Sequence, residues 1–497
     1  MPATESSTQK KVFIETFGCQ MNILDTELVR DKLAPLGYEF VSSPKNANVV
    51  LYNTCSVRDL SEQKVRSRLG QDRMRKEAGD DVVVGVLGCM AERAGQELIQ
   101  KYPHIDLLAG PSQLDQVPAL LENHFVEDHQ SSFDRIALSG FRKRQKGQET
   151  DRLEQIEALD QERMGEINQS RQAFVRITRG CNKFCSFCVV PMTRGPEVHR
   201  PPQGLIDEVK RLVDQGAREV TLLGQTINHY TYHEGGKTTS FADLLHQIHE
   251  ATPDLPRLRF LTSYPRDFTE EALDVMAASE RICNYLHIPA QSGSNAVLKK
   301  MNRGYTKEIY MDLIHMAREK MPDISIVGDM IVGFPNETEE DFVMSLEMLR
   351  EVKYKNIFAF KYSPRPGTVS GKRDADPIPQ AEKKSRNARM LAVQQEISLA
   401  HHQNMLEKTY DVLVEGIAKI DPSQRKPESP AENNGLLQIG GPKIAQPEPT
   451  DRVRLTARTR GDHIVAFDGP ANLIGSIVPV QITDAASLSL KGHLVQR

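Results

Sequence analysis

Short apolar runs alternate with amphipathic stretches over the first quarter of the chain. The runs are rich in Val, Ile, Leu and Tyr, and the stretches between them place apolar residues at helical spacing. This alternation predicts an open parallel α/β sheet with right-handed crossovers, which we assign to residues 10–126. We predict strands at 11–16, 47–53, 81–87 and 105–109 and helices at 25–36, 57–76 and 91–101.

The same alternation returns near residue 173 and continues through six strand–helix units. Every predicted strand ends in polar or glycine-containing sequence, such as Gly-Gln-Thr-Ile-Asn after the second and Pro-Ala-Gln-Ser-Gly-Ser after the fourth. The chemistry of β/α barrels lies on these loops, so residues 167–402 predict an enzyme built on a partial (β/α)6 barrel. We predict its strands at 174–177, 219–223, 257–261, 285–288, 324–331 and 356–360, followed by a helix at 380–406.

The pattern changes in two other segments. Residues 127–166 are rich in Gln, Glu, Arg and Lys and predict an exposed polar linker, in which Leu153, Ile156 and Leu159 have the spacing of a short amphipathic helix. Residues 403–485 become strand-like and predict a small antiparallel β-barrel. Its strands are expected at 410–414, 453–458, 464–467 and 476–482, with a long proline-rich loop between Pro422 and Pro449.

Composition agrees with a multidomain globular protein. The chain has 497 residues, of which 39% are hydrophobic and 26% charged. No apolar segment follows the amino terminus and no long apolar run occurs elsewhere, so we expect a cytoplasmic protein without a membrane segment. Seven cysteines in a reducing compartment favour metal binding or catalysis over disulfides.

The net charge of −4 argues against a uniformly basic nucleic-acid-binding surface. Basic residues nevertheless gather locally, with seven between Arg58 and Lys76 and an alternating set near the C-terminus, Arg452, Arg454, Arg458 and Arg460. Such faces can supply phosphate contacts, although each is also what an ordinary solvated surface would carry.

Three cysteines stand in one predicted loop with the spacing C-x3-C-x2-C. These are Cys181, Cys185 and Cys188. Three thiolates so close can hold three corners of a four-iron cluster and leave the fourth iron open for chemistry. A structural zinc site would need a fourth ligand nearby, and the sequence supplies none.

Three further cysteines each follow a predicted strand of the N-terminal sheet. Because the carboxyl ends of parallel strands meet at one edge, Cys19, Cys55 and Cys89 should come together despite their separation in sequence. The alternative is that each is a small buried core residue. Their matching placement favours a second three-thiolate iron site.

Four motifs carry a resemblance to a known family. The cysteine loop continues into Val-Val-Pro-Met-Thr-Arg-Gly, and the N-terminal cysteines stand in Phe-Gly-Cys-Gln-Met-Asn, Asn-Thr-Cys-Ser-Val-Arg and Gly-Cys-Met-Ala. With these motifs the chain resembles radical S-adenosylmethionine (SAM) enzymes of the methylthiotransferase branch, from Lys11 to about Thr483. Gln-Met-Asn after Cys19 and Ser-Val-Arg after Cys55 are similar to the MiaB-type tRNA-modifying members.

The resemblance implies a reaction. An N6-isopentenylated adenosine at position 37 of tRNA would receive a methylthio group on C2, with two SAM molecules consumed per turnover. A [4Fe-4S] cluster on Cys181, Cys185 and Cys188 would generate the radical. A second [4Fe-4S] cluster on Cys19, Cys55 and Cys89 would present or donate the sulfur, and the second SAM would supply the methyl group.

The resemblance also implies binding residues. Phe187 would pack near adenine, and Gly224 and Gln225 would lie near the methionine part of SAM. The residues Ser263, Gln291, Ser292, Gly328 and Gly333 are further candidates for cofactor binding. The C-terminal barrel resembles a TRAM domain, an RNA-binding module, and we expect RNA contacts from Arg194, Arg454, Arg458 and Arg460.

The expected partners are tRNA, an electron donor and a source of sulfur or clusters, with the chain acting as a monomer. Two other readings stay open. A related methylthiotransferase would act on threonylcarbamoyladenosine in tRNA or on a ribosomal-protein aspartate. A non-catalytic iron–sulfur protein would bind RNA without cleaving SAM.

Overall fold

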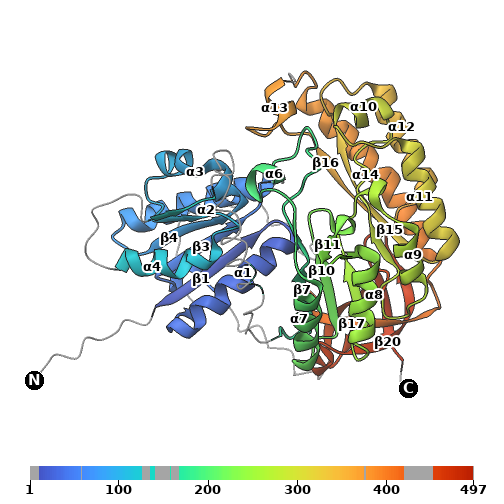
Figure 1. Ribbon diagram of the computed structural model, residues 1–497, viewed down its shortest axis with the longest axis horizontal. Helices are drawn as coiled ribbons and strands as arrows, with labels where there is room; N and C mark the ends of the chain where they lie inside the picture. Colours follow the sequence, from blue (N-terminus) through green and yellow to red (C-terminus); the bar gives the residue numbers. More distant parts are fainter. Residues whose placement is uncertain are drawn as a thin grey trace, which may run out of the picture.

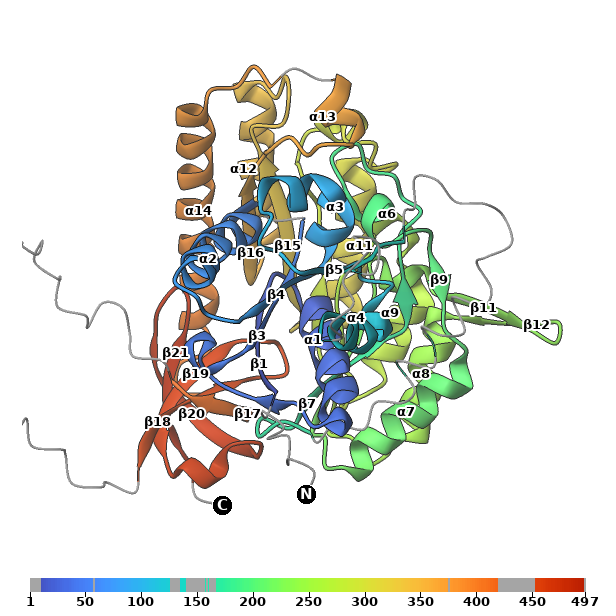
Figure 2. The ribbon, with the colours of Figure 1, turned by 90° about the vertical axis from the view of Figure 1, so that its left-hand side faces the viewer.

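A computed structural model describes residues 10–56, 59–125, 135–139, 157, 160, 167–373, 376–418 and 452–495. Figure 1 shows the N-terminal sheet beside the central barrel, with the C-terminal strands packed against one end of that barrel. The same arrangement is seen from the side in Figure 2, where helix α14 runs along the central barrel toward the C-terminal strands. Within the described part of the chain, no helix is long and apolar enough to cross a membrane.

The N-terminal domain is a parallel sheet of six strands in the order β2-β1-β3-β4-β5-β6. The four predicted strands are confirmed as β1 Lys11–Phe17, β3 Val49–Thr54, β4 Val83–Gly88 and β5 Leu107–Ala109. Two short edge strands were not predicted, β2 Glu39–Phe40 and β6 Ile136–Ala137. The helices are α1 Gln20–Leu33, α2 Asp59–Glu77, α3 Cys89–Lys101 and α4 Val117–Phe125.

One boundary in this domain differs from the prediction in a way that matters for function. The first helix was expected at 25–36, but α1 begins at Gln20, directly after Cys19. Amphipathic spacing is weak over its first turn, which explains the missed start. Cys19 therefore lies at the N-terminus of a helix, and Cys89 is the first residue of α3.

The central domain is the predicted partial barrel. Two three-stranded parallel sheets, β13-β10-β7 and β14-β15-β16, are joined between β13 and β14 by backbone hydrogen bonds such as Ser263 N–H to the His287 carbonyl, 3.0 Å. Its strands are β7 Gln172–Arg176, β10 Glu219–Leu223, β13 Arg257–Phe260, β14 Tyr285–His287, β15 Ser325–Val332 and β16 Asn356–Lys361. The covering helices are α7 Pro202–Asp214, α8 Phe241–Ala251, α9 Glu270–Ala277, α10 Asn295–Lys300, α11 Lys307–Lys320, α12 Glu339–Val352, α13 Val369–Arg373 and α14 Gln380–Gln403.

The C-terminal domain is a closed barrel of five strands in the order β17-β18-β19-β21-β20. The fifth strand was not predicted, and the barrel is not purely antiparallel because β19 and β21 pair in parallel. The proline-rich segment between Pro422 and Pro449 lies outside the described residues. The strands are β17 Thr409–Ile417, β18 Val453–Arg458, β19 Ile464–Gly469, β20 Ile477–Ala485 and β21 Leu490–Leu494.

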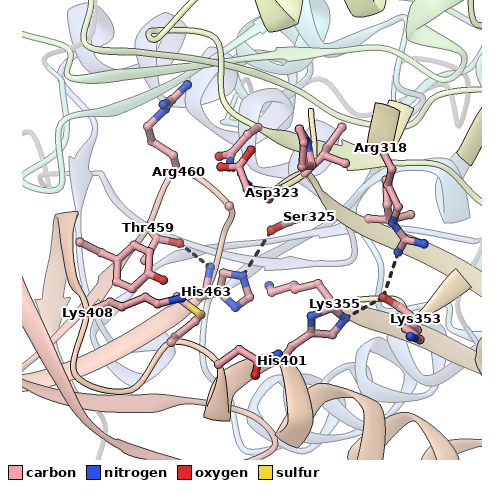
Figure 3. Close-up of a pocket in the computed structure, with 18 of the residues that line it drawn as sticks. Arg318, Asp323, Ser325, Lys353, Lys355, His401, Lys408, Thr459, Arg460 and His463 are labelled. Carbon is pink, nitrogen blue, oxygen red and sulfur yellow. Dashed lines mark hydrogen bonds between the residues drawn. The ribbon is translucent and has the colours of Figure 1, made fainter. Parts of the chain in front are cut away.

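This small barrel docks on the amino-terminal ends of the central strands. Arg257, which begins β13, donates to the backbone carbonyls of Arg458 (2.8 Å) and Asp411 (2.7 Å). A polar pocket of about 590 Å³ lies at the interface, and Figure 3 shows lysine, arginine and histidine side chains around it, including Lys355 and His463. The pocket therefore lies at the amino-terminal end of the central strands. The loops that follow the central strands lie at the opposite end of the central barrel.

Part of the predicted linker is folded. Ile136–Ala137 forms β6, and Asp160 is buried rather than exposed. Burial disfavours the Asp160 carboxylate, but Arg176, Arg179 and Arg200 together hold its pKa well below the usual range. The prediction of exposure is thus wrong at Asp160, because a polar residue can be buried once cations surround it. Leu153, Ile156 and Leu159 lie outside the described residues.

Candidate active site

The cysteine loop is closed at its base by a short hairpin. Strand β8 (Thr178–Arg179) precedes the loop and pairs with β9 (Val198–His199), which follows it. The Cys181 N–H also donates to the Gly195 carbonyl at 3.2 Å. All three thiols of the loop therefore extend from one closed turn at the carboxyl end of β7.

Each sulfur in this loop has a polar neighbour. Thr226 Oγ1 lies 3.3 Å from Cys181 Sγ, Arg303 Nη1 donates to Cys185 Sγ at 3.2 Å, and the Val190 N–H donates to Cys188 Sγ at 3.5 Å. Burial, with the neighbouring Cys185, raises the pKa of Cys188 to about 12. A thiol in such surroundings becomes a thiolate when a metal supplies positive charge.

The spacing of the sulfurs favours a cluster over a single ion. Neither three-cysteine set brings all its sulfurs within 4.8 Å of one another, whereas the ligands of one tetrahedral zinc ion lie closer than that. All seven cysteines are free of disulfides. The residues present thus fit three-thiolate iron–sulfur sites.

We expect Gly180→Ala to prevent assembly of the radical-SAM cluster. Gly180 has a φ of +67°, and a Cβ there would overlap the Pro196 carbonyl oxygen, so the hairpin that closes the loop must shift. Iron analysis after anaerobic reconstitution should fall from about eight to about four irons per chain.

Gly37→Ala is the matched control, because Gly37 also has a positive φ, +81°, but a Cβ there would meet no atom within 4 Å. If Gly180→Ala keeps its full iron content, the close packing of the hairpin is not needed for the cluster.

The N-terminal cysteines converge as predicted. Gly18 has a φ of +124° and lies so close to Cys55 that a Cβ would overlap that side chain. A hydrogen bond with Cys55 lowers the pKa of Cys19 to about 6 against the opposing effect of burial, and the Arg194 cation adds to the lowering. Burial instead raises the pKa of Cys89, which lies in the field of the same arginine.

A short helix links the two cysteine sets. Helix α6 (Val190–Thr193) begins two residues after Cys188, and Figure 1 shows it against α3, the helix that Cys89 begins. The Thr193 side chain hydrogen-bonds to Cys89. Arg194 follows directly and donates to the buried Asp25 carboxylate at 2.8 Å. The chain that leaves one set of thiols therefore contacts the other.

This position corrects the expectation for Arg194. Its side chain is 6% exposed and is held by Asp25 and by Asn22 Oδ1 at 3.1 Å, so it does not face solvent where RNA could bind. Beside Cys19 and Cys89 it instead supplies positive charge to the thiolates.

A cavity of about 430 Å³ opens next to Cys188. Phe187 lines it and packs edge-to-face on Phe334 with ring centroids 6.3 Å apart. Gln291 also lines it, and within the described part of the chain neither Gln291 Oε1 nor Ser263 Oγ, at the carboxyl end of β13, has a hydrogen-bond partner. Buried polar atoms without partners are expected where a ligand completes their bonding. The geometry fits Phe187, Gln291 and Ser263 as cofactor-binding residues.

The other predicted cofactor residues have structural roles. Ser292 is buried and its hydroxyl bonds within the protein, at 3.2 Å from the Ser294 N–H. A Cβ at Gly328 would lie 2.8 Å from Tyr354, and one at Gly333 would overlap Lys383. Gly224 packs against Thr178, while Gln225 is half-buried in the loop that brings Thr226 to Cys181. Ser292, Gly328 and Gly333 are therefore packed within the protein, and their contact with the cofactor stays a prediction.

Sequence reasoning missed several residues at this site. Thr226 and Arg303 contact cluster sulfurs, and Asp329 lines the cavity. Asp59 from α2 pairs with Arg365 at 2.9 Å and brings the N-terminal domain to the cavity wall. Thr226 follows the predicted Gly224-Gln225 pair directly, which was the one available signal. Nothing in the sequence marks Arg303, because it lies in the loop between α10 and α11, far from Cys185 along the chain.

We expect Arg303→Met to make the reduction potential of the radical-SAM cluster more negative. The substitution removes a hydrogen bond to Cys185 Sγ and a buried cation, both of which stabilise the more negative reduced cluster. Redox titration followed by electron paramagnetic resonance measures the shift. Arg266→Met, which removes an exposed arginine of a neighbouring loop, should leave the potential unchanged. An unchanged potential in Arg303→Met would contradict the role of this hydrogen bond.

The C-terminal arginines are mostly engaged within the protein. Arg458 pairs with Glu415 (2.9 Å) and Asp462 (2.7 Å). Arg460 donates to the Ile282 carbonyl at 2.8 Å, in the wall of the interface pocket of Figure 3. Arg460 thus joins the small barrel to the central one, whereas the Arg458 side chain is engaged within the small barrel, and neither guanidinium is free for the predicted RNA contact. Arg454 pairs only with the exposed Asp468 among the described residues and remains accessible.

Comparisons with known proteins agree with this architecture. Family models match residues 11–110 (Uncharacterized protein family UPF0004), 175–349 (Radical SAM superfamily) and 448–495 (TRAM domain). Among solved structures, the radical S-adenosylmethionine methyltransferase TsrM from Kitasatospora setae superposes with a TM-score of 0.50 at 16% identity. The match covers 73% of this chain and 77% of that one, and supports the fold alone.

Curated relatives are similar along the whole chain. A tRNA-2-methylthio-N(6)-dimethylallyladenosine synthase from Porphyromonas gingivalis is 38% identical over 99% of this chain and 97% of its own length. The protein of the same name from Rhodopirellula baltica is 37% identical over 98% of this chain and 96% of its own. The chain belongs to the family of tRNA-2-methylthio-N(6)-dimethylallyladenosine synthases, within the radical SAM superfamily.

Proposed function

We propose that this protein replaces the C2 hydrogen of N6-isopentenyladenosine at position 37 of tRNA with a methylthio group. The observation that carries the proposal is the close connection between two three-cysteine sets. Thr193 and Arg194, which follow the radical-SAM loop directly, contact or neighbour the thiols of Cys19 and Cys89. Hydrogen abstraction and sulfur transfer can therefore act on one substrate atom.

The radical half of the reaction belongs to Cys181, Cys185 and Cys188. These three thiolates would hold a [4Fe-4S] cluster, which would supply the one-electron reduction of SAM that hydrogen abstraction from the base requires. Phe187 would pack against the adenine of SAM, and Gln291 Oε1 and Ser263 Oγ, which lack partners among the described residues, would hydrogen-bond to the cofactor. Arg365, paired with Asp59, forms part of the cavity wall.

The sulfur half belongs to Cys19, Cys55 and Cys89, which hold the second cluster. Arg194 places a buried cation beside these thiolates, and the Asp25 carboxylate fixes its direction. A second SAM molecule supplies the methyl group. The reaction needs a one-electron donor and a source of sulfide, and the chain acts as a monomer.

RNA contacts are assigned to the accessible face of the C-terminal barrel. Arg454 lies on β18 with its side chain 40% exposed, where a phosphate could replace the exposed Asp468 as its partner. Arg458 and Arg460 are not included, because their guanidinium groups are occupied within the protein.

The test is a comparison of substrates with the reconstituted, reduced protein. Anticodon stem-loop RNAs carrying isopentenyladenosine, threonylcarbamoyladenosine or plain adenosine at position 37 are incubated with SAM and sulfide, together with an aspartate-containing ribosomal-protein substrate. Mass spectrometry should find a methylthio group on the isopentenylated RNA alone. Product on the threonylcarbamoyl RNA or on the protein would identify one of the related activities instead. Absence of SAM cleavage would indicate a non-catalytic cluster protein.

A further inference from the structure

We propose a divalent metal site formed by Glu197, His199 and His229, separate from both cysteine sets and beyond the proposed reaction. The ligating atoms of these three side chains all lie within 4.8 Å of one another. Among the described His, Cys, Asp and Glu side chains, no other group of three meets this spacing. Two imidazoles and a carboxylate are ligands that zinc and its first-row neighbours prefer.

The fold brings the three residues together from two segments. Glu197 and His199 are two positions apart at strand β9, so their side chains lie on the same face. His229 ends the short 3-10 turn Ile227–His229 after β10. Figure 2 shows β9 next to β11 at the base of the projecting β11–β12 hairpin (Thr231–Glu234 and Lys237–Ser240), and His199 contacts Thr231 there.

Glu197 is the strongest indication of a missing cation. Its side chain is 2% exposed, and Oε2 lies 2.6 Å from His229 Nδ1. Within the described part of the chain, its other oxygen, Oε1, is buried and has no hydrogen-bond partner. A buried carboxylate oxygen without a partner is costly, and a metal ion placed between Glu197 and the two imidazoles would remove that cost.

The distances suit a single ion. Neighbouring ligands of a tetrahedral ion with bonds near 2.05 Å are about 3.4 Å apart. The separation of Glu197 Oε1 from His199 Nε2 is 3.9 Å and that of Glu197 Oε2 from His229 Nδ1 is 2.6 Å, so the two values bracket the ideal. Binding of one ion requires the three side chains to adjust from these separations, each of which is already below 4.8 Å. His229 is 42% exposed, which leaves room for water at a fourth position.

The surroundings orient His199 as a ligand. Its Nδ1 lies against the Thr231 backbone, 2.6 Å from the carbonyl oxygen and 2.7 Å from the amide nitrogen. The Thr231 N–H donates to Nδ1, which places the proton of the neutral ring on Nε2, facing Glu197, and a metal ion bound at Nε2 would replace that proton. The ring is also stacked on Tyr230, with centroids 5.5 Å apart and planes inclined by 20°. Outer contacts of this kind are typical of metal-binding histidines.

An ion at this position would stabilise the base of the radical-SAM loop. The Glu197 N–H donates to Asn182 Oδ1 at 3.1 Å, next to Cys181. His229 lies in the segment whose Thr226 hydroxyl contacts Cys181 Sγ. The metal would therefore join β9, which follows the cysteine loop, to the loop after β10. The position of Cys181 depends on both segments.

The test uses the reconstituted holoenzyme, equilibrated with zinc and freed of excess by gel filtration. Elemental analysis should find about one zinc per chain beside the full iron content, and X-ray absorption at the zinc edge should show nitrogen and oxygen neighbours without sulfur. Zinc should raise the thermal transition midpoint by about 3 °C or more. In His199→Ala/His229→Ala and in Glu197→Gln, bound zinc should fall at least tenfold, with iron retained.

His233→Ala is the matched control, because His233 is an exposed histidine of the neighbouring hairpin that hydrogen-bonds only to Thr238 among the described residues. It should bind zinc as the unaltered protein does. Three results would overturn the site: no zinc in the unaltered holoenzyme, zinc retained in both variants, or sulfur neighbours in the absorption spectrum. Loss of tRNA methylthiolation would not bear on it, since the zinc content is measured independently of activity.

Discussion

Replacing Cys19, Cys55 and Cys89 together with alanine should abolish methylthiolation of tRNA while SAM cleavage continues. The iron content should fall from about eight to about four per chain, because only the loop of Cys181, Cys185 and Cys188 still holds a cluster. That loop has its own base hairpin and its own contacts from Thr226 and Arg303, none of which involves the three substituted thiols. Iron analysis and 5′-deoxyadenosine release measure the two effects.

The seventh cysteine provides the control for this experiment. Cys283 is buried among Tyr285, Val327 and Leu261 and belongs to neither ligand set. Cys283→Ala should keep all the iron and the methylthiolated product. Methylthiolated tRNA from the triple variant would show that the N-terminal thiols do not supply the sulfur.

Substituting Asp25 with asparagine should have the largest effect on stability. Asp25 is fully buried and accepts from Arg176 at 2.7 Å and from Arg194 at 2.8 Å, so one carboxylate holds two arginines of the central domain to the N-terminal domain. Removing the charge leaves both cations short of a partner, at a cost of about 3–5 kcal/mol. The thermal transition midpoint should fall by about 10 °C.

Product formation should also fall, because Arg194 would lose its orientation beside Cys19 and Cys89. Asp484→Asn is the control, since Asp484 pairs with Lys491 on the surface and both side chains are about 60% exposed. The thermal transition midpoint of this variant should equal that of the unaltered protein. Equal shifts in the two variants would mean that the buried ion pairs do not hold the domains together.

Periodicity predicted the parts of the fold that depend on local pattern. Strands β3, β4 and β10 are buried at every position, because both faces of each parallel sheet are covered. The ends of the predicted strands then located Cys19, Cys55, Cys89 and the radical-SAM loop. Short edge strands such as β6 and the last strand β21 carry little pattern in two to five residues, and were missed.

The roles of charged residues could not be predicted in the same way. Arg194, Arg458 and Arg460 look like RNA contacts in sequence, because an arginine engaged by a carboxylate or carbonyl elsewhere in the protein has no local mark. Partners from other segments engage them: Asp25 for Arg194, Glu415 for Arg458 and the Ile282 carbonyl for Arg460. Glycines posed the same problem, since the packing of Tyr354 on Gly328 is visible only in three dimensions.

The identity of the modified base is tested most directly on tRNA from cells. Bulk tRNA from a strain lacking this gene is digested to nucleosides and compared by mass spectrometry with tRNA from the same strain carrying the gene on a plasmid. We predict isopentenyladenosine without 2-methylthio-isopentenyladenosine in the deletion strain and restoration of the methylthiolated nucleoside by the plasmid, but not by the gene for the Cys19, Cys55, Cys89 triple variant. Undiminished 2-methylthio-isopentenyladenosine in the deletion strain would contradict the assignment of this protein to that reaction.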